Sequence, residues 1–265
     1  MYSHLQLARK YAHYYLHAAN SKGHGMHSPF VFDFIGHVLN NKSGYQPPQA
    51  IEDLRRELLR DKTALEIRDL GAGSRIGASK RRTVQEVAST AVKPRKFGHF
   101  FYRLVSHYQP RVIVELGTSL GITTAYLATA NPAARVITIE GSEAVYGKAT
   151  DNLRRLGLQN IETLNGNFDT VLPAVLDSVE VVDLSYIDGN HRYAPTMAYF
   201  RQLLPKTHNH SALIFDDIHW SHEMEEAWSA VKAHPDVYCT VDLFFLGIVF
   251  FRKEFKEKQH FSIRF

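Results

Sequence analysis

The chain has a single cysteine, Cys239, among its 265 residues. One cysteine cannot form an intramolecular disulfide, and there is no cysteine cluster that could bind structural zinc. Long apolar runs are absent too: Asp242 and Gly247 interrupt the richest stretch, 241–251, and a membrane span needs ~18 apolar residues. The first ten residues contain His, Arg and Lys and lack the apolar segment of a secretory signal. We therefore expect a cytoplasmic protein without a membrane span.

The net charge is small as well, since the chain has 31 basic and 27 acidic residues, an excess of +4. This excess is compatible with a nucleic-acid partner or with a scattered, solvated surface. Histidine, by contrast, is abundant: the 15 histidines leave a metal or acid–base role open for some of them. The length suits one large domain, or one domain with an appendage, and its core needs no disulfide or metal.

Two compositional regions meet near Gln109-Pro110. The first is predicted to be α-rich and to lack a strand series, with helices at 3–18, 29–39, 49–60 and 84–108, the last interrupted near Pro94. In the second region, short β-branched runs alternate with amphipathic segments, which is typical of βαβ units on a parallel sheet. Strands are predicted at 111–115, 136–140, 161–164, 181–187 and 212–215. Helices are predicted at 119–130, 143–156, 169–176, 193–204 and 221–234.

The last two apolar runs, 238–244 and 247–252, are joined by too few residues for a crossover helix and predict an antiparallel hairpin at the sheet edge. The predicted fold is α/β: a Rossmann-like, doubly wound, seven-stranded and mostly parallel sheet with this edge hairpin, plus an N-terminal helical appendage. We expect residues 1–96 to be a helical cap or substrate region and residues 97–265 to be the ligand-binding domain.

In an open α/β sheet, ligands bind beyond the carboxyl ends of the strands. Each predicted strand of the second region is followed by acidic, amide or glycine residues, in the segments 115–121, 140–142, 165–169, 188–191 and 216–219. Gly117 and Gly121 let the backbone approach a ligand at a helix N-terminus. A dinucleotide enzyme would show Gly-x-Gly-x-x-Gly here, whereas Gly-x-Ser-x-Gly after Glu115 favours a smaller ligand with an amino acid and a nucleoside. Glu140 lies 140 − 115 = 25 residues later, where a carboxylate accepts both ribose hydroxyls.

With these motifs, residues 97–252 resemble the class I S-adenosylmethionine-dependent methyltransferases. The resemblance implies that the first turn cradles the methionine part of the cofactor, that the acid after the second strand binds the ribose, and that the turn after the third strand flanks the adenine. The cofactor-binding residues that it implies are Glu115, Gly117, Ser119, Gly121, Glu140, Asn167 and Phe168.

Two further motifs, Ile-Asp-Gly-x-His-x-Tyr at 187–193 and Phe-Asp-Asp at 215–217, resemble those of metal-assisted small-molecule O-methyltransferases of the catechol and macrolide-sugar type. The resemblance implies Mg²⁺ on Asp188, Asp216 and Asp217, where it orients the substrate hydroxyl and lowers its pKa. Some of these enzymes have a second Asp as general base at the position of Asn190, which cannot serve. The candidate catalytic residues are therefore Asp188, His191 and His219.

Several alternatives stay open at this point. The three acids could instead cap a helix, lie in solvent, or bind substrate without metal. A nucleic-acid methyltransferase is disfavoured for two reasons. The Asn/Asp-Pro-Pro-aromatic motif of base amino-group methylation is absent after the fourth strand. Methylation at cytosine C5 needs a thiolate, and the single cysteine, Cys239, lies in the terminal strand pair. A non-catalytic module with the same fold remains a third reading, and a homodimer is left open. The leading hypothesis is S-adenosylmethionine-dependent O-methylation of a small-molecule hydroxyl.

Two N-terminal features have no assigned role. Asp69–Ser74 imitates a cofactor loop, but it lacks a preceding apolar strand, and the basic run at 80–82 is a poor start for a core helix. We interpret it as a surface loop, with the alternative that its basic residues lie near an anionic substrate. The aromatic residues and histidines of the first two helices form either a cap over the substrate pocket or a packed appendage.

Overall fold

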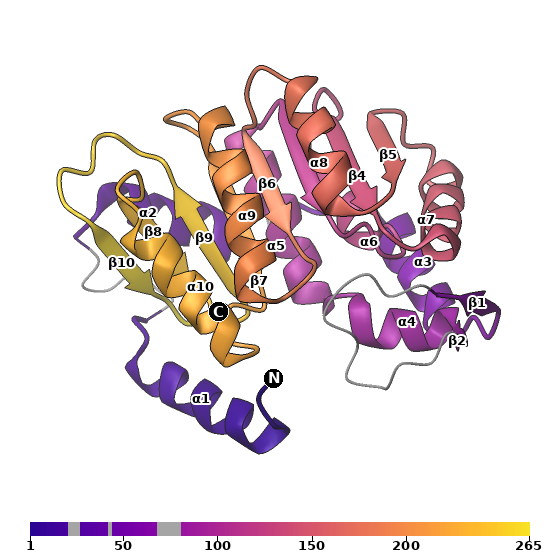
Figure 1. Ribbon diagram of the computed structural model, residues 1–265, viewed down its shortest axis with the longest axis horizontal. Coiled ribbons are helices and arrows are strands. Elements are labelled where there is room, and N and C mark those ends of the chain that lie inside the picture. The colour runs from indigo at the N-terminus through magenta and orange to yellow at the C-terminus, as the bar shows by residue number, and fades with distance from the viewer. Residues whose placement is uncertain (21–26, 42–43, 68–80) are drawn as a thin grey trace. The chain divides into compact units, whose positions relative to one another are not determined.

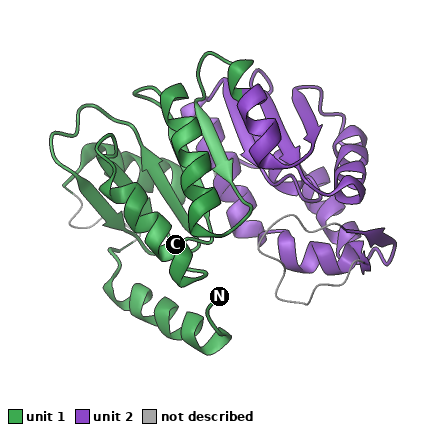
Figure 2. Ribbon diagram, viewed as in Figure 1, with its two compact units in different colours: residues 1–40, 176–265 green, residues 41–175 purple. Residues whose placement is uncertain are grey.

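The structure is a computed structural model that describes residues 1–20, 27–41, 44–67 and 81–265. It has two compact units (Figure 2): unit 1 comprises Met1–Asn40 and Leu176–Phe265, and unit 2 comprises Asn41–Val175. Both units combine helices with strands (Figure 1). The predicted surface loop Asp69–Ser74 and residues Arg75, Lys80 and His24 lie outside the described residues.

Three parallel strands form the centre of unit 2: β3 (Val112–Leu116), β4 (Arg135–Glu140) and β5 (Ile161–Asn165). β4 pairs with both neighbours, and the register places Ile139 opposite Leu116 and Glu140 opposite Asn165. The carboxyl ends of the three strands therefore lie along one rim of unit 2.

Helices α3 (Gln49–Leu58), α4 (Val84–Ala91), α5 (Arg95–Tyr108), α6 (Ile122–Ala130) and α7 (Glu143–Arg155) belong to unit 2, and α8 (Phe168–Asp177) crosses into unit 1. α4 starts with a capping box, because the Thr83 hydroxyl accepts from the Glu86 amide and the Glu86 carboxylate accepts from the Thr83 amide. Side chains such as Leu54, Val87 and Tyr126 form one apolar core.

A small antiparallel strand pair in unit 2 was not predicted. It consists of β1 (Ala64–Glu66) and β2 (Arg81–Thr83). Each strand has only three residues, too few for a period-two pattern to stand out in the sequence. The expectation was that residues before Pro110 lack a strand series, and this single short pair is an addition to that description. Arg81 and Arg82, from the predicted basic run, lie in β2.

Unit 1 contains five strands in the order β10, β8, β9, β7, β6. β6 (Leu184–Ile187) and β7 (Ala212–Asp216) are parallel, while β9 (Leu246–Phe250) is antiparallel to both β7 and β8 (Cys239–Asp242). The predicted hairpin is thus confirmed, but it is not at the edge, because β10 (Gln259–Ser262) pairs in parallel with β8. Together with the three strands of unit 2, the described residues contain eight strands of this sheet, whereas seven were predicted. The additional strand, β10, was not predicted because a four-residue polar segment gives little sequence signal.

The helices of unit 1 are α1 (His4–His17), α2 (Pro29–Phe34) with a π-helical turn at Ile35–Leu39, α9 (Tyr193–Leu203) and α10 (His222–Ala233). A capping box of Ser3 and Gln6 starts α1. Tyr14 and Ala18 of α1 pack against Phe244, and the Tyr14 hydroxyl donates to the Ile263 carbonyl. α1 is thereby attached to the ends of β8 and β10.

The predicted division at residues 96 and 97 does not coincide with the compact units. Residues 41–96 share unit 2 with 97–175, and residues 1–40 belong to unit 1. In unit 2, α5 packs so closely on α6 that any side chain at Gly98 would collide with the Tyr126 ring, and Tyr126 donates to Glu52 of α3. The predicted roles of 1–96 and 97–265 stay predictions. Among the described helices, none is long and apolar enough to cross a membrane.

Candidate functional site

The turn after β3 adopts a backbone conformation that suits its glycines. Gly117 has φ 105°, Ser119 has φ 48°, and Gly121 has φ 83°. A Cβ at Gly121 would also lie 3.1 Å from Leu153 Cγ, so a side chain there would be strained on two counts. The turn then enters α6 at Ile122. Its local shape follows directly from the residues that the sequence places there.

Glu115, in β3 just before this turn, is held by hydrogen bonds from neighbouring elements. Its carboxylate is 0% exposed, and Oε2 accepts hydrogen bonds from the hydroxyls of Thr124 at 2.5 Å and Thr138 at 2.7 Å. Buried carboxylates are tolerated when such donors satisfy them. Glu115 therefore ties β3, β4 and α6 together, and its direct contact with a ligand stays a prediction.

Glu140 organises the two turns that follow β3 and β4. Its Oε2 accepts from the Ser119 amide and its Oε1 from the Ser142 amide, both at 2.9 Å. A carboxylate oxygen can accept more than one hydrogen bond. The Ser119 and Ser142 hydroxyl oxygens are buried and have no hydrogen-bond partner within the described part of the chain. Two hydroxyls and one carboxylate thus converge on the rim after β3 and β4.

The turn after β5 completes this rim. The Gly166 amide donates to the Glu140 carbonyl at 3.0 Å, and the Asn165 side chain donates to the same carbonyl at 2.8 Å. Asn167 is exposed and accepts from the Asp169 amide at 3.0 Å, while Phe168 is half-buried at the start of α8. All seven predicted cofactor-binding residues therefore lie in unit 2, at the ends of β3, β4 and β5.

In unit 1, ligand-type side chains meet at the ends of β6 and β7. Asp188, His191 and Asp216 each present an atom within 4.8 Å of the others'. His191 Nε2 lies 3.5 Å from Asp188 Oδ1, and Asp216 is 1% exposed. The Tyr186 hydroxyl donates to Asp188 Oδ2 at 2.8 Å. Burial, with the neighbouring carboxylates of Asp188 and Asp216, raises the pKa of Tyr186 well above its usual value, so this hydroxyl stays a donor.

Asp217 does not belong to this group of three. It has φ 51°, and its amide donates to the Phe245 carbonyl at 2.7 Å, so the chain turns sharply after Asp216. Asn190 also has φ 55°; its amide group donates to the Tyr199 hydroxyl at 3.1 Å, and its oxygen accepts from Arg192. Asn190 braces the turn that carries Asp188 and His191.

His219 is held on both sides of its ring. Nδ1 lies 3.0 Å from Glu225 Oε1, and Nε2 lies 2.9 Å from Asp242 Oδ2. Burial alone would lower the pKa of His219, but the Asp242 and Glu225 carboxylates outweigh it and raise the pKa above its usual value. The ring also stacks on Phe244, with centroids 5.1 Å apart. While both contacts are kept, neither ring nitrogen can accept a substrate proton.

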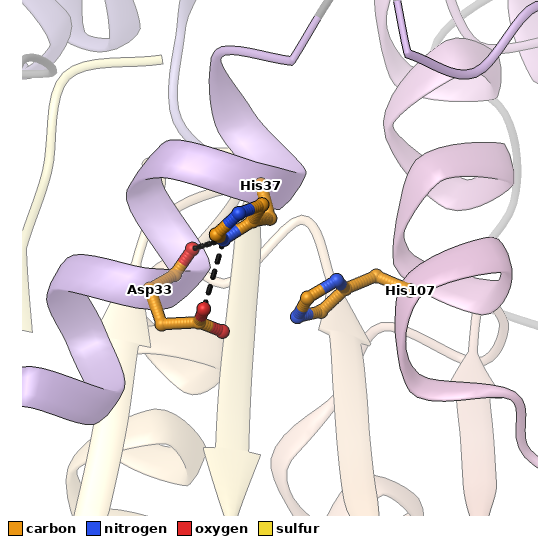
Figure 3. Close-up of side chains that lie close together, drawn as sticks. All are labelled: Asp33, His37 and His107. Atoms are coloured by element: carbon orange, nitrogen blue, oxygen red, sulfur yellow. Dashed lines mark hydrogen bonds and ion pairs between the residues drawn. The ribbon is translucent and has the colours of Figure 1, made fainter.

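A separate histidine–carboxylate pair lies on the second helical segment of unit 1. Figure 3 shows His37 Nδ1 in contact with Asp33, 2.8 Å from Oδ1 and 3.2 Å from the carbonyl oxygen. The third residue labelled there, His107, belongs to α5 of unit 2. A pair four residues apart with exposed side chains is ordinary for a solvent-facing helix.

The chain is similar to a known protein family in sequence and to solved proteins in structure. The sequence model of a family described as a methyltransferase domain matches residues 114–218, which begin in β3 and end just after Asp217. This stretch of the chain is therefore similar to a methyltransferase domain. No curated protein has a significant sequence match.

Solved structures show the same fold. A putative caffeoyl-CoA O-methyltransferase from Staphylococcus aureus has 20% identity, with 62% of this chain and 87% of that chain covered and a TM-score of 0.55. The O-methyltransferase TomG from Streptomyces achromogenes, in complex with S-adenosylmethionine, has 16% identity, covers 82% and 95%, and has a TM-score of 0.58. A Podospora anserina methyltransferase bound to S-adenosylhomocysteine has 11% identity, with 85% of this chain and 97% of that chain covered and a TM-score of 0.61. The predicted Rossmann-like fold of class I S-adenosylmethionine-dependent methyltransferases is confirmed.

The residues of unit 2 fit S-adenosylmethionine, the cofactor that the sequence motifs predict. The Glu140 carboxylate, at the end of β4, suits ribose hydroxyls as an acceptor, and the buried Ser119 hydroxyl has no hydrogen-bond partner among the described residues. Sequence reasoning missed Ser142, although its place two residues after Glu140 was a usable signal.

The cluster of unit 1 also fits a divalent cation. Asp188 and Asp216 provide the oxygen ligands that Mg²⁺ and Mn²⁺ prefer, and the imidazole of His191 is a ligand more typical of Fe²⁺ or Zn²⁺. The sequence expected Asp217 as the third ligand and His191 as a base, whereas the structure places His191 beside the two carboxylates. It also shows partners that the sequence did not reveal: Tyr186 for Asp188, and Glu225 and Asp242 for His219.

Proposed function

We propose that the protein is an S-adenosylmethionine-dependent O-methyltransferase that acts on a hydroxyl group of a small molecule. The observation that carries the proposal is that the segment similar to a methyltransferase domain has polar side chains at the strand ends of both units. These are Glu140, Ser119 and Ser142 in unit 2, and Asp188, His191 and Asp216 in unit 1. The first set suits the cofactor and the second suits a hydroxyl that must lose its proton.

Unit 2 provides cofactor binding in this proposal. Glu140 accepts the ribose hydroxyls, the turn after β3 holds the methionine part, and Asn167 with Phe168 flanks the adenine. S-adenosylmethionine, when bound, supplies a methyl group whose bond to sulfur breaks as the acceptor oxygen bonds to its carbon, which leaves S-adenosylhomocysteine. The protein contributes mainly orientation, because two reactants held in line avoid much of the entropic cost of their encounter.

Unit 1 provides the proton chemistry. Asp188, 3.5 Å from His191 Nε2, positions the ring so that the pair takes up the proton of the acceptor hydroxyl. Where a divalent cation is bound, Asp188, Asp216 and His191 hold it, and it supplies Lewis acidity that lowers the pKa of the hydroxyl. His219 is a positioning residue in either case, since both its nitrogens are engaged.

A pocket within unit 1 is large enough for part of a small molecule, and Asp188, His191 and Asp216 are not among the residues that line it. It has a volume of about 570 Å³, which is in the range of small-molecule sites, and lies between α1 and the chain after β7 and β8. Tyr14, His219 and Phe244 line it. This supports the prediction that the N-terminal helices form part of a substrate region. A small-molecule partner, a cytoplasmic location and a homodimer belong to the same proposal; the sole, buried cysteine suits a reducing compartment.

Calorimetry of cofactor binding tests the proposal through Glu140→Ala. We expect S-adenosylhomocysteine to bind the native protein and to bind the variant about 10- to 100-fold more weakly, because charge-assisted hydrogen bonds to ribose are lost. The matched control is Glu162→Ala, which removes an exposed carboxylate paired with Arg135 in the same unit. Equal affinity of the Glu140 variant and the native protein would refute the assigned ribose contact, and no binding to either would refute the function.

A further inference from the structure

Two neighbouring strands of unit 1 fix the carboxylates of the Asp188–His191–Asp216 cluster. β6 and β7 pair in parallel with Ile187 opposite Phe215, so Asp188 and Asp216 follow at adjacent strand ends. Asp216 is 1% exposed, whereas the Asp188 side chain is 21% exposed. The cluster therefore has one carboxylate in the interior of the unit and one that solvent reaches.

The third group of the cluster is an imidazole. His191 follows Asp188 by three residues on the same turn, and its side chain is 22% exposed. Asp217, which would give a third carboxylate, does not belong to the cluster, because the chain turns there at φ 51° and its amide donates to the Phe245 carbonyl. Among the described residues, the cluster therefore offers two carboxylates and one nitrogen ligand.

The distance between His191 and Asp188 suits two ligands of one small ion. Nε2 and Oδ1 lie 3.5 Å apart. An N–H···O hydrogen bond between them would have a length of ~2.7–3.2 Å. Two ligands ~2.0–2.1 Å from a tetrahedral Zn²⁺ are ~3.3 Å from each other. Adjacent ligands ~2.1 Å from an octahedral Mg²⁺ are only ~3.0 Å apart. The observed separation is thus closer to the tetrahedral value.

Tyr186 orients Asp188 for this contact. Its side chain is 0% exposed, and its hydroxyl donates to Asp188 Oδ2 at 2.8 Å, while Oδ1 is the oxygen near His191. Ca²⁺ takes about six to eight oxygen ligands and is poorly served by two carboxylates and a nitrogen. Zn²⁺ and Fe²⁺ bind imidazole and carboxylate together, and three protein ligands leave a position for a substrate oxygen.

We propose that Nε2 of His191 is a metal ligand and that the cluster binds a divalent transition metal of the Zn²⁺ or Fe²⁺ type in preference to Mg²⁺. This inference rests on the metal-assisted part of the proposed function and names its ion. It also changes the role of His191, because a nitrogen that binds a cation cannot accept a proton at the same time. His191 then holds the ion and is not the base.

Calorimetry of the full chain, stripped of metal with EDTA, tests the preference with Zn²⁺ and Mg²⁺. We expect the native protein to bind Zn²⁺ about 1,000-fold or more tightly than Mg²⁺, and this ratio to fall about 100-fold in His191→Asp, whose ligands are all oxygen. His222→Asp is the matched control, at a 75% exposed histidine side chain of α10 in the same unit, and should keep the native ratio. An equal ratio in His191→Asp and the native protein would overturn the proposal.

Pulsed electron paramagnetic resonance of bound Mn²⁺ detects a coordinated nitrogen directly and needs no variant. We expect nitrogen coupling in the native protein and in His222→Asp, and none in His191→Asp or in a second variant, His191→Gln. Native protein without this coupling, or coupling that persists in both His191 variants, would contradict the assignment. Circular dichroism confirms that each variant is folded.

The outcomes separate this inference from the proposed function. Neither measurement uses S-adenosylmethionine or follows methyl transfer, so a negative result leaves the cofactor site at Glu140 untouched. A native protein that binds neither Zn²⁺ nor Mg²⁺ would overturn this inference and metal assistance together. Loss of S-adenosylhomocysteine binding, in contrast, would refute the methyltransferase function while the His191 measurements still decide the ligand.

Discussion

At the scale of single residues, the proton and metal chemistry that we propose for unit 1 depends on Asp188, His191 and Asp216. His219 lies close by in sequence, but Glu225 and Asp242 occupy both its nitrogens. Tyr186 engages Oδ2 of Asp188 and leaves Oδ1 directed at His191. The carboxylate of Asp188 is thus oriented by one neighbour and shared with another, which is how ligating carboxylates are commonly held.

We predict that Asp188→Asn weakens cation binding. Titration of Mn²⁺ followed by electron paramagnetic resonance should show a site in the native protein whose affinity falls about 10-fold or more in the variant, since one anionic ligand becomes neutral. Chelation should then lower methylation of catechol to a similar degree. Asp236→Asn, at an exposed carboxylate of unit 1, is the control. Activity that is indifferent to chelator, with no Mn²⁺ site, would exclude metal assistance and leave the Asp188–His191 pair as the base.

At the scale of elements, a partly buried ion pair joins α7 to the turn between α3 and β1. Lys148 Nζ lies 2.7 Å from Asp61 Oδ2, and the Thr63 amide donates to Asp61 Oδ1 at 2.9 Å. The hydrogen bonds from Lys148 and Thr63 lower the pKa of Asp61 from 3.8 to about 2. The charged form of Asp61 therefore stabilises the folded state.

The pH dependence follows from the sign of this shift. Because the folded-state pKa is the lower one, the stabilisation is complete above pH ~4 and disappears as the pH falls to about 2. We predict that Asp61→Asn lowers the free energy of unfolding by roughly 1–2 kcal/mol at pH 7, allowing for screening of a partly exposed pair, and by little at pH 2. Denaturant unfolding at both pH values measures this. Asp53→Asn, at a solvent-exposed pair, should leave the free energy of unfolding nearly unchanged, and an equal loss in both variants would contradict the prediction.

At the scale of the whole molecule, the cofactor residues lie in one compact unit and the cation-type residues in the other. Ligand binding stabilises the part of a protein that it contacts against local opening. We predict that S-adenosylhomocysteine slows hydrogen exchange in unit 2 at the amides of Ser119, Ser142 and Gly166, with little change in β8 and β10 of unit 1. Mass spectrometry of exchanged peptides measures this. Protection centred on β8 and β10 would place the cofactor elsewhere.

The sequence alone was enough for the elements that depend on local chemistry. Alternating β-branched runs and amphipathic segments predicted the strands and helices after Pro110, and the glycines at 117 and 121 marked a turn with positive φ. These signals are short-range, because propensity, periodicity and the freedom of glycine act within a few residues. The motif residues on the two rims, and with them the methyltransferase class, were predictable for the same reason.

Only the tertiary structure decided which side chains meet. It brought the amides of Ser119 and Ser142 to one carboxylate, placed His191 rather than Asp217 beside Asp188 and Asp216, and enclosed His219 between two carboxylates. It also added β10 outside the predicted edge and left one side of α1 exposed. These outcomes depend on the packing of segments far apart in the chain and on the turn that Asp217 makes at φ 51°, and no local pattern encodes either.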